Sequence, residues 1–264
     1  MKKPSISIIT PCYNSQKYLS KMISSVISQT YTDWQLIIVD DCSTDNSVKV
    51  IEKFLKLDHR IKLIKLKKNK GQAFARNKAI NVAKGRYITF LDSDDYWDIK
   101  FLEYSLHFIK QHSFIYSSYN RVNENGTYID TIKSIPKVNL SRVLKGTPIS
   151  CLSAFIDTKK FGKIFFPLEF NREDLAYWVL LLNHFKFAYG CNFCEANYRL
   201  HRKSSSKNKI KMAYFTWKDY KDKYNLSLFK SIYYFIHYAV RGYLKFLRHI
   251  FLKILYFLLF IKTR

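Results

Sequence analysis

Four short runs of β-branched and aromatic residues alternate with apolar helical patterns through the first ninety residues, and this alternation constrains the fold most. The runs span 5–10, 34–39, 61–65 and 87–91 and predict β-strands. Between them, apolar residues recur every three or four positions within 19–27, 48–55 and 79–83, which predicts helices. Strands and helices in this order predict an α/β fold with a parallel, doubly wound sheet. Ligands bind such sheets beyond the carboxyl ends of the strands.

After residue 98 the pattern becomes mixed. The sequence predicts a helix over 102–109, a strand over 114–119, a hairpin turn at 124–126 and a helix over 175–185. We expect one large domain made of two halves, 1–98 and 99–205, followed by a tail, 206–264. The hydrophobic content of 48% supports a sizeable core.

Polar residues follow three of the predicted strands, at 11–14, 40–43 and 92–95. The last segment holds Asp92, Asp94 and Asp95, whose carboxylates repel one another unless positive charge lies among them. A hard divalent cation, Mg²⁺ or Mn²⁺, takes oxygen ligands and shares them with a substrate diphosphate. The alternative is an acidic turn that caps the next helix. The segment alone leaves both interpretations open.

The formal charge of +25, from 45 Lys and Arg against 20 Asp and Glu, predicts attraction to a polyanion. Nucleic acid, an anionic membrane surface and a phosphorylated substrate are the candidates. The excess is regional, because 199–264 holds 16 Lys and Arg against two Asp.

The cysteines and the N-terminus bear on the compartment. Five scattered cysteines argue against a disulfide framework and favour a reducing cytosol. The apolar run after Lys3 breaks at Pro11, which is too early for the core of a signal peptide.

The last forty residues, 225–264, are rich in Phe, Tyr, Leu and Ile with interspersed basic residues. On a helix, five basic residues fall within about 80° of one another: Lys230, His237, Arg241, Lys245 and Arg248. The longest later stretch free of basic residues, 254–261, is far shorter than the roughly 20 residues of a spanning helix. We therefore expect an amphipathic, membrane-associated helix lying on an anionic leaflet. A helix packed on its own domain or on a second subunit is the alternative.

Four motifs resemble, in order and spacing, those of the family-2 glycosyltransferases, inverting enzymes of the GT-A fold. They are SIITPCYN at 7–14, VDDCSTD at 39–45, GQAFARN at 71–77 and FLDSDD at 90–95. The likeness covers roughly residues 5–205 and is specific as a combination. It implies a GT-A, Rossmann-like, mostly parallel sheet with helices on both faces. It also implies that 1–98 binds a nucleotide sugar and 99–205 the acceptor.

The resemblance implies a UDP site at the first two strand ends. Pro11 and Tyr13 would pack against the base, next to Thr10. Asp41 would accept a hydrogen bond from the N–H of uracil. Capping of the helix that follows is the alternative for Asp41.

The same resemblance implies a diphosphate and metal site. Arg76 would bind the diphosphate through two oxygens, with a solvated surface arginine as the alternative. Asp92 and Ser93 would lie near the ribose, and Asp94, together with Asp92, would ligate Mn²⁺ or Mg²⁺. Such a cation would stabilise the charge left on UDP. Asp95 would ligate it or orient its neighbours.

An inverting transfer also requires a general base that takes the proton of the acceptor hydroxyl. Asp174 matches the Glu-Asp motif of the family, and the N-terminus of the following helix would keep its carboxylate ionised. Glu173 is the alternative base, and a structural cap is the alternative role.

Several residues are candidates for contacting acceptor or diphosphate: Asp95, Glu173, Arg199, His201 and Arg202. The last three belong to a segment that resembles the closing Tyr-Arg-x-His segment of the family, with a basic surface loop as the alternative. Cys191 and Cys194, with His184 and His201, have the superficial spacing of a zinc site, but we interpret them as core residues.

The sequence therefore predicts a metal-dependent, inverting transferase that moves a sugar from UDP to a hydroxyl of a polyprenyl-diphosphate saccharide in bacterial surface polysaccharide synthesis. Its tail would hold it on the cytoplasmic face of the cell membrane. A sugar nucleotidyltransferase is the alternative enzyme, although its Gly-rich loop is missing from the sequence. A basic nucleic-acid-binding protein is the non-enzymatic alternative, but the acidic strand ends argue against a nucleic acid partner.

Overall fold

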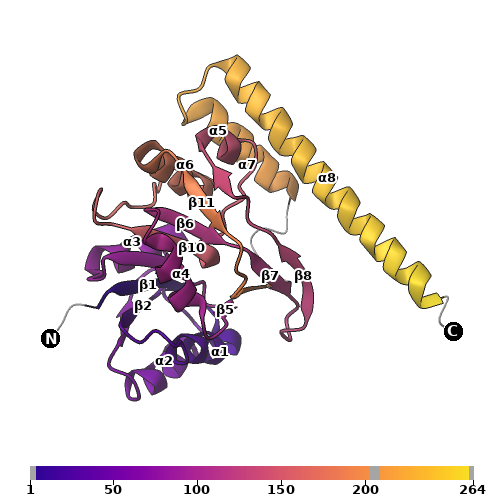
Figure 1. Ribbon diagram of the computed structural model, residues 1–264. Coiled ribbons are helices and arrows are strands. Elements are labelled where there is room, and N and C mark those ends of the chain that lie inside the picture. The colour runs from indigo at the N-terminus through magenta and orange to yellow at the C-terminus, as the bar shows by residue number, and fades with distance from the viewer. Residues whose placement is uncertain (1–3, 202–208, 262–264) are drawn as a thin grey trace.

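The computed structural model describes residues 4–201 and 209–261, with 209 and 245–261 as backbone only. Its centre is an eight-stranded sheet with the order β3-β2-β1-β4-β10-β6-β11-β9 (Figure 1). The four predicted strands are all present and mutually parallel: β1 (Ile6–Cys12), β2 (Trp34–Asp40), β3 (Ile61–Lys65) and β4 (Tyr87–Phe90). Their carboxyl ends therefore meet at one edge of the sheet.

The second half of the chain completes this sheet with β6 (Phe114–Ser117), β9 (Lys137–Val138), β10 (Ala154–Asp157) and β11 (Ala188–Cys191). β10 is antiparallel to both of its neighbours, and β9 is antiparallel to β11. Six of the eight strands thus run in one direction, in a mixed sheet. The two predicted halves share this sheet, because β10 lies between β4 and β6.

A smaller sheet has the order β5-β12-β7-β8. Its strands are β5 (Tyr96–Trp97), β7 (Tyr119–Val122), β8 (Tyr128–Ile132) and β12 (Ala196–Arg199). The single strand predicted over 114–119 was wrong, because the chain breaks at Ser118 and gives β6 to the large sheet and β7 to the small one. The predicted hairpin is confirmed between β7 and β8, with Gly126 at a φ of +89°.

Helices cover both faces of the large sheet. One face carries α1 (Gln16–Ile27), α2 (Ser47–Leu55) and α4 (Phe101–Ile109). The other carries α3 (Gln72–Val82), α5 (Leu140–Leu144), α6 (Glu173–Phe185) and α7 (Lys209–Asp222). Side chains of β1 alternate between the two cores, with Ile8 in one and Ile9 in the other, as the two-residue period of a strand requires.

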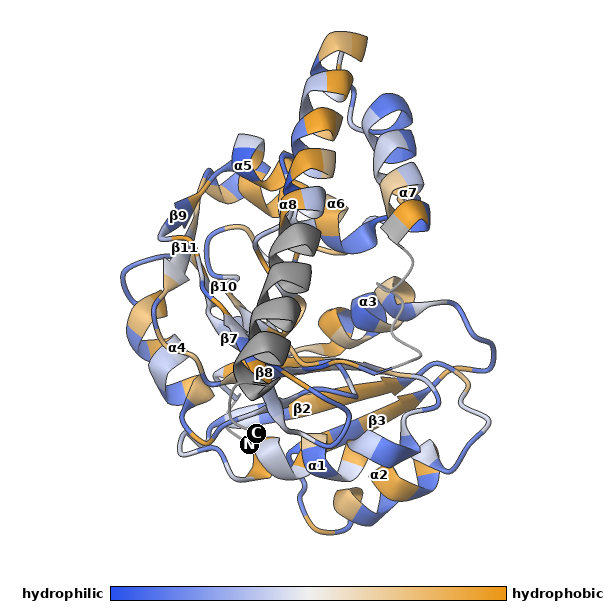
Figure 2. Ribbon diagram, turned by 90° about the vertical axis from the view of Figure 1, so that its right-hand side faces the viewer, coloured by the Kyte–Doolittle hydropathy of each residue, from blue (hydrophilic) through white to orange (hydrophobic). Residues whose placement is uncertain are grey.

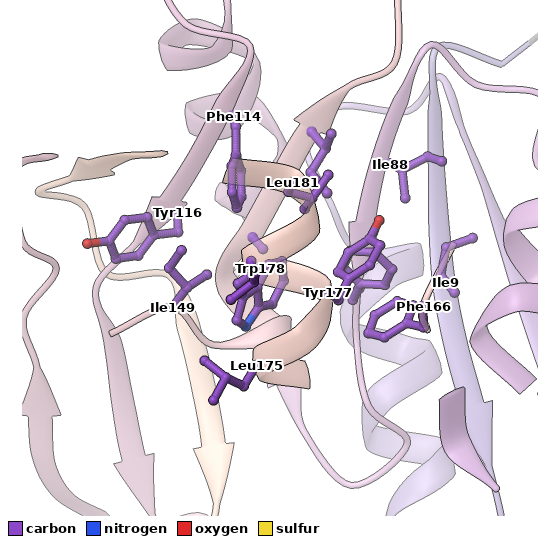
Figure 3. Close-up of a cluster of buried hydrophobic side chains, with 14 of the residues drawn as sticks. Ile9, Ile88, Phe114, Tyr116, Ile149, Phe166, Leu175, Tyr177, Trp178 and Leu181 are labelled. Atoms are coloured by element: carbon purple, nitrogen blue, oxygen red, sulfur yellow. The ribbon is translucent and has the colours of Figure 1, made fainter. Parts of the chain in front are cut away.

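The core between the sheet and α6 is largely aromatic (Figure 3). Phe166 stacks on Tyr177 with ring centroids 3.8 Å apart, and Phe90 meets both rings edge-on. Trp178 stacks on Phe114, with ring centroids 5.8 Å apart, and also meets Phe90 edge-on. This packing fixes the N-terminal turn of α6 relative to the end of β4.

The last helix, α8 (Leu228–Ile261), turns back along α7 and then projects from the body (Figure 1). Its inner side packs on the main core through Tyr234 and Phe235, and Ser231 is fully buried. α7 belongs to the same core, because Thr216, Asp219 and Tyr220 are also fully buried. Within the described ranges, no helix combines the length and apolarity needed to cross a bilayer.

Candidate active site

The ends of β1 and β2 form the first part of the site. Thr10 and Pro11 are buried within β1, whereas the ring of Tyr13 is 49% exposed just beyond it. Asp41 is buried and accepts hydrogen bonds from the backbone N–H groups of Lys70 and Gly71, at 2.7 and 2.8 Å. Asp41 therefore joins β2 to the loop before α3 and does not cap α2, so that alternative was wrong.

Arg76 lies on the inner side of α3 and pairs with Asp92 at the end of β4. The distance from Nη2 to Oδ1 is 2.7 Å, and the arginine is only 2% exposed. Burial alone would lower the pKa of Arg76, but the charge of Asp92 raises it above its ordinary value. The alternative of a solvated arginine was therefore wrong. Arg76 holds Asp92 in place through Oδ1, and within the described residues Oδ2 of that carboxylate accepts no hydrogen bond.

Ser93, Asp94 and Asp95 follow Asp92 and are bound to other elements. Ser93 shares a 2.7 Å hydrogen bond with Ser15, at the start of α1. Asp94 Oδ2 lies 2.7 Å from His201 Nε2. Burial, and then the neighbouring charge of Asp92, raises the pKa of Asp94.

Asp95 points inward and joins β12 to the acidic segment. It is 1% exposed and accepts a 2.8 Å hydrogen bond from the backbone N–H of Arg199. Arg199 returns a bond from Nε to the carbonyl oxygen of Asp94, at 2.8 Å. The next helix, α4, has Lys100 at its N-cap and receives no side-chain cap bond. The acidic segment therefore caps no helix, contrary to that alternative.

The donor set at this edge fits a cation that it shares with a substrate. In the described part of the chain, no group of three His, Cys, Asp or Glu side chains is arranged to hold a metal ion. Mg²⁺ and similar ions are commonly held by only one or two carboxylates, with phosphate and water as the other ligands. Asp92 and Asp94 provide two such carboxylates, with 28% and 32% of their side chains exposed.

The N-terminal turn of α6 carries the remaining acidic residues of the candidate site, Glu173 and Asp174. Glu173 accepts a 2.7 Å hydrogen bond from Gln72 of α3. Asp174 is 40% exposed in its side chain, and its Oδ1 lies 3.4 Å from Arg172 Nε. Burial raises the pKa of the Cys151 thiol, and the charges of Asp92, Asp174 and Glu173 raise it further, against the opposing charge of Arg76. The carboxylates that follow β4 and begin α6 therefore all act on the same thiol.

Two hollows are lined in part by candidate site residues, one by Glu173 and the other by Arg199. One, of about 480 Å³, lies between α3 and α6 and is lined by Lys70, Gly71, Gln72, Ala73, Phe74, Leu168, Phe170 and Glu173. The other, of about 370 Å³, lies between α1 and the β7–β8 turn and is lined by Lys17, Tyr18, Lys21, Tyr96, Glu124, Asn125, Gly126 and Arg199. Both combine aromatic and charged side chains, which suits polar ligands that present a ring face.

The motif-bearing part of the chain matches a known family. The model of "Glycosyl transferase family 2" matches residues 7–164. The chain belongs to glycosyl transferase family 2. This glycosyltransferase is 41% identical over 240 residues to "Putative teichuronic acid biosynthesis glycosyltransferase TuaG" of Bacillus subtilis. The match covers 90% of this chain and 95% of that protein.

Further relatives agree with this assignment. The glycosyltransferase is 36% identical to "UDP-Glc:alpha-D-GlcNAc-diphosphoundecaprenol beta-1,3-glucosyltransferase WfgD" of Escherichia coli, over 90% of this chain and 93% of that one. The crystal structure of S. aureus TarS 1–349 in complex with UDP-GlcNAc superposes with a TM-score of 0.66 at 23% identity, covering 90% of this chain and 72% of that one. This structural likeness is to the fold, and TarS has the GT-A architecture.

The remaining predicted residues of this glycosyltransferase are placed as follows. Arg199 and His201 both contact the acidic segment and form no separate surface loop. Arg202 lies outside the described residues. All five cysteines are free thiols, and His201 is bound to Asp94, so the zinc arrangement receives no support.

Sequence reasoning missed three residues around the site. Tyr18 stacks on His201, with centroids 5.4 Å apart, and donates to Glu124 at 2.8 Å. Asp219 of α7 is fully buried beneath the turn that precedes Asp174. One feature of the sequence could have identified Asp219, because its negative charge is one of only two in a strongly basic tail.

Proposed function

We propose that this glycosyltransferase moves a sugar from a UDP-sugar to a hydroxyl of a lipid-linked, diphosphate-bearing saccharide, with inversion at the anomeric carbon. The observation that carries the proposal is the gathering of Tyr13, Asp41 and the Asp92–Asp94 pair at one sheet edge, with Asp174 acting on the same Cys151 thiol as Asp92. The names of the relatives support the substrates, since WfgD is named for UDP-Glc and a diphosphoundecaprenol acceptor.

The nucleotide would bind over the ends of β1 and β2. The exposed ring of Tyr13 offers a stacking face, next to Thr10 and Pro11, and Asp41 offers acceptor lone pairs beyond the two that its backbone bonds use. Arg76 would act mainly by fixing Asp92, while Ser93 would approach the ribose.

Asp92 and Asp94 would hold Mn²⁺ or Mg²⁺ together with the donor diphosphate. The bound cation would supply charge stabilisation for the departing UDP. His201 already contacts Asp94, so it would orient that carboxylate in the loaded site. Arg199 would hold the same segment through its hydrogen bond to the carbonyl oxygen of Asp94.

Asp174 would accept the proton of the acceptor hydroxyl. Its Oδ1 is occupied by Arg172, and Oδ2 accepts no hydrogen bond within the described residues. As the proton moves to Oδ2, the acceptor oxygen would bond to the anomeric carbon from the face opposite UDP, and the bond from that carbon to the phosphate oxygen would break. The attack from the opposite face gives inversion.

The acceptor would use the hollow between α3 and α6. Phe74 and Phe170 offer faces for a sugar ring, Glu173 and Gln72 offer hydrogen bonds, and Lys70 offers positive charge for a diphosphate. This hollow adjoins Asp174 through the first turn of α6.

The exposed side of α8 would dock on an anionic membrane, on the cytoplasmic face of the cell membrane. Five large apolar residues at helical spacing are exposed on α8: Phe229, Ile232, Ile236, Val240 and Tyr243. Figure 2 shows apolar and polar segments alternating along the coloured part of this helix. Of the predicted basic stripe, Lys230 and Arg241 are exposed beside this face, and His237 is half-buried, while the side chains of Lys245 and Arg248 lie outside the description. Apolar residues flanked by cations favour anionic lipid.

A panel of UDP-sugars, measured by UDP release with and without a polyprenyl-diphosphate saccharide, tests the proposal. We expect one donor to give acceptor-dependent release that a chelator abolishes. Product formation from UTP and a sugar phosphate, without acceptor-dependent release, would instead identify a sugar nucleotidyltransferase.

A further inference from the structure

We infer that Asp219 of α7 and Tyr238 of α8 are positioning residues for Asp174, so that the C-terminal helices complete the active site. The inference rests on the proposed role of Asp174 as the general base. It assigns to α7 and α8 a function in the reaction, in addition to any membrane contact.

Asp219 holds the segment that leads into α6. Its Oδ1 accepts hydrogen bonds from the backbone N–H of Asn171 at 3.1 Å and from the amide side chain of the same residue at 2.7 Å. Its Oδ2 accepts from the backbone N–H of Arg172 at 2.8 Å. Asp219 is fully buried, and Lys223 lies 3.4 Å from Oδ1. A buried carboxylate is retained at low cost only when it is paired and hydrogen-bonded in this way.

Arg172 carries the connection from Asp219 to Asp174. While its backbone is held by Asp219, its Nη1 donates to Thr216 Oγ1 at 3.1 Å and to Tyr238 OH at 3.3 Å. Its Nε lies 3.4 Å from Asp174 Oδ1. The arginine is thus fixed at its backbone by α7 and at its guanidinium by α7 and α8. Its remaining contact orients Oδ1 of Asp174, and among the described residues Oδ2 accepts no hydrogen bond.

The chemistry explains why a carboxylate is needed at position 219. The segment presents three N–H donors and no acceptor. A carboxylate offers two acceptor oxygens, whereas an asparagine amide would turn one N–H group against another. Asp219→Asn should therefore release part of the segment while keeping the size of the side chain.

A truncation after residue 225 would be an ambiguous test of these contacts. It would remove Tyr238 together with the membrane-facing side of α8, so lost membrane binding and lost positioning would be confounded. Point variants on the buried side of α7 and α8 separate the two effects.

The test uses the full chain, with a UDP-sugar and a soluble acceptor analogue, and compares Asp219→Asn and Tyr238→Phe with Asp222→Asn and Tyr214→Phe. The control residues are exposed on α7. We expect kcat to fall about 10²-fold for Asp219→Asn, the scale of a misplaced catalytic group. For Tyr238→Phe we expect about fivefold, the loss of one hydrogen bond. The Kd for UDP should stay within about twofold in both.

Two further measurements distinguish positioning from a general loss of structure. Amide hydrogen exchange of Asn171 and Arg172 should accelerate in Asp219→Asn while β1 and β4 remain protected. In an Arg172→Lys background, Tyr238→Phe should have no added effect on kcat, because both act through one contact.

The outcomes separate this inference from the proposed function. If Asp174→Ala is inactive but Asp219→Asn and Tyr238→Phe retain the wild-type kcat, the positioning role is overturned. The same holds if UDP affinity and kcat fall together. If Asp174→Ala keeps full activity, the assigned base is wrong, and the proposed mechanism fails first.

Discussion

At the scale of single residues, Asp174 and Glu173 are adjacent in the chain but are held differently. Glu173 is bonded to Gln72, whereas Oδ2 of Asp174 accepts no hydrogen bond from the part of the chain that the structure describes. We expect Asp174→Asn to lower kcat about 10³-fold, the usual contribution of a general base, with UDP binding in Mn²⁺ unchanged. Glu173→Gln, the comparison variant, should retain most of kcat and raise the KM for the acceptor, because Glu173 lines the proposed acceptor hollow. Steady-state kinetics and calorimetric UDP titration measure both, and an active Asp174→Asn enzyme would refute the base assignment.

Asp94 provides a second residue-scale prediction. Its carboxylate is one of two that fit a shared cation. Asp94→Ala should abolish transfer and remove the increase in UDP affinity that Mn²⁺ gives to the wild-type protein. Titrations with Mn²⁺ and with excess chelator measure this increase. A variant that still binds UDP more tightly with Mn²⁺ would show that the metal lies elsewhere.

The sequence motifs located most residues of the candidate site at one sheet edge but not their orientation. Asp41, Asp92 and Asp94 were found because they follow recognisable strands. The inward position of Arg76 and the inward turn of Asp95 depend on Asp92 and Arg199, partners that are 16 and 104 positions away in the chain. Local patterns carry no such information, and for the same reason Asp219 was missed.

At the scale of elements, the first four strands and three helices were predicted because each buries a regular apolar pattern. β9 and β10 were not predicted. The direction of the strands in the second half of the chain could not be predicted either. A short buried strand has the same composition whether it pairs parallel or antiparallel. β10 is reversed only because its neighbours in space are β4 and β6.

Gly190 in β11 gives a prediction at this scale. A Cβ at this position would lie 2.1 Å from the carbonyl oxygen of Ile135. Gly190→Ala must therefore separate β11 from the chain before β9, and we expect a loss of about 3 kcal/mol in the free energy of unfolding. Gly162→Ala is a poor control because of its positive φ, so Gly242→Ala, in open space on α8, is the suitable one. Equal denaturation midpoints would contradict the close approach.

The outer side of α8 gives a prediction about membranes. Phe229 and Ile236 are 85% and 55% exposed on it. Replacing both with Ser should weaken binding to anionic vesicles about tenfold or more, because each apolar side chain contributes ~1.5–3 kcal/mol when buried. Leu57→Ser, at a 78% exposed position beyond α2, is the control. Unchanged co-sedimentation of the double variant would exclude this face as the docking surface.

At the scale of the whole molecule, two paired carboxylates, Asp58 and Asp157, should lose their contribution to stability in acid. Hydrogen bonds from Arg60 lower the pKa of Asp58, and bonds from Arg86 outweigh burial and lower the pKa of Asp157. A lowered pKa stabilises the folded state above the unfolded value of about 4. This stability is lost as the pH falls through the native pKa values. Denaturation at pH 7, 5 and 3 should show the loss below pH 4, and less of it in Asp157→Asn. An equal acid dependence in the variant would contradict this.

The pairing of β10 with β4 also has a consequence for biosynthesis. One edge of β4 is paired by β10, so this edge stays exposed until residues 154–157 have been synthesised. At ordinary elongation rates the ribosome needs roughly 3 to 13 seconds to add the intervening chain. During that interval the nascent polypeptide exposes the unpaired edge of β4 in a sheet of four parallel strands. Such an edge is a template for association with other chains. Chaperone occupancy on translating ribosomes should accordingly be highest while 91–153 emerges.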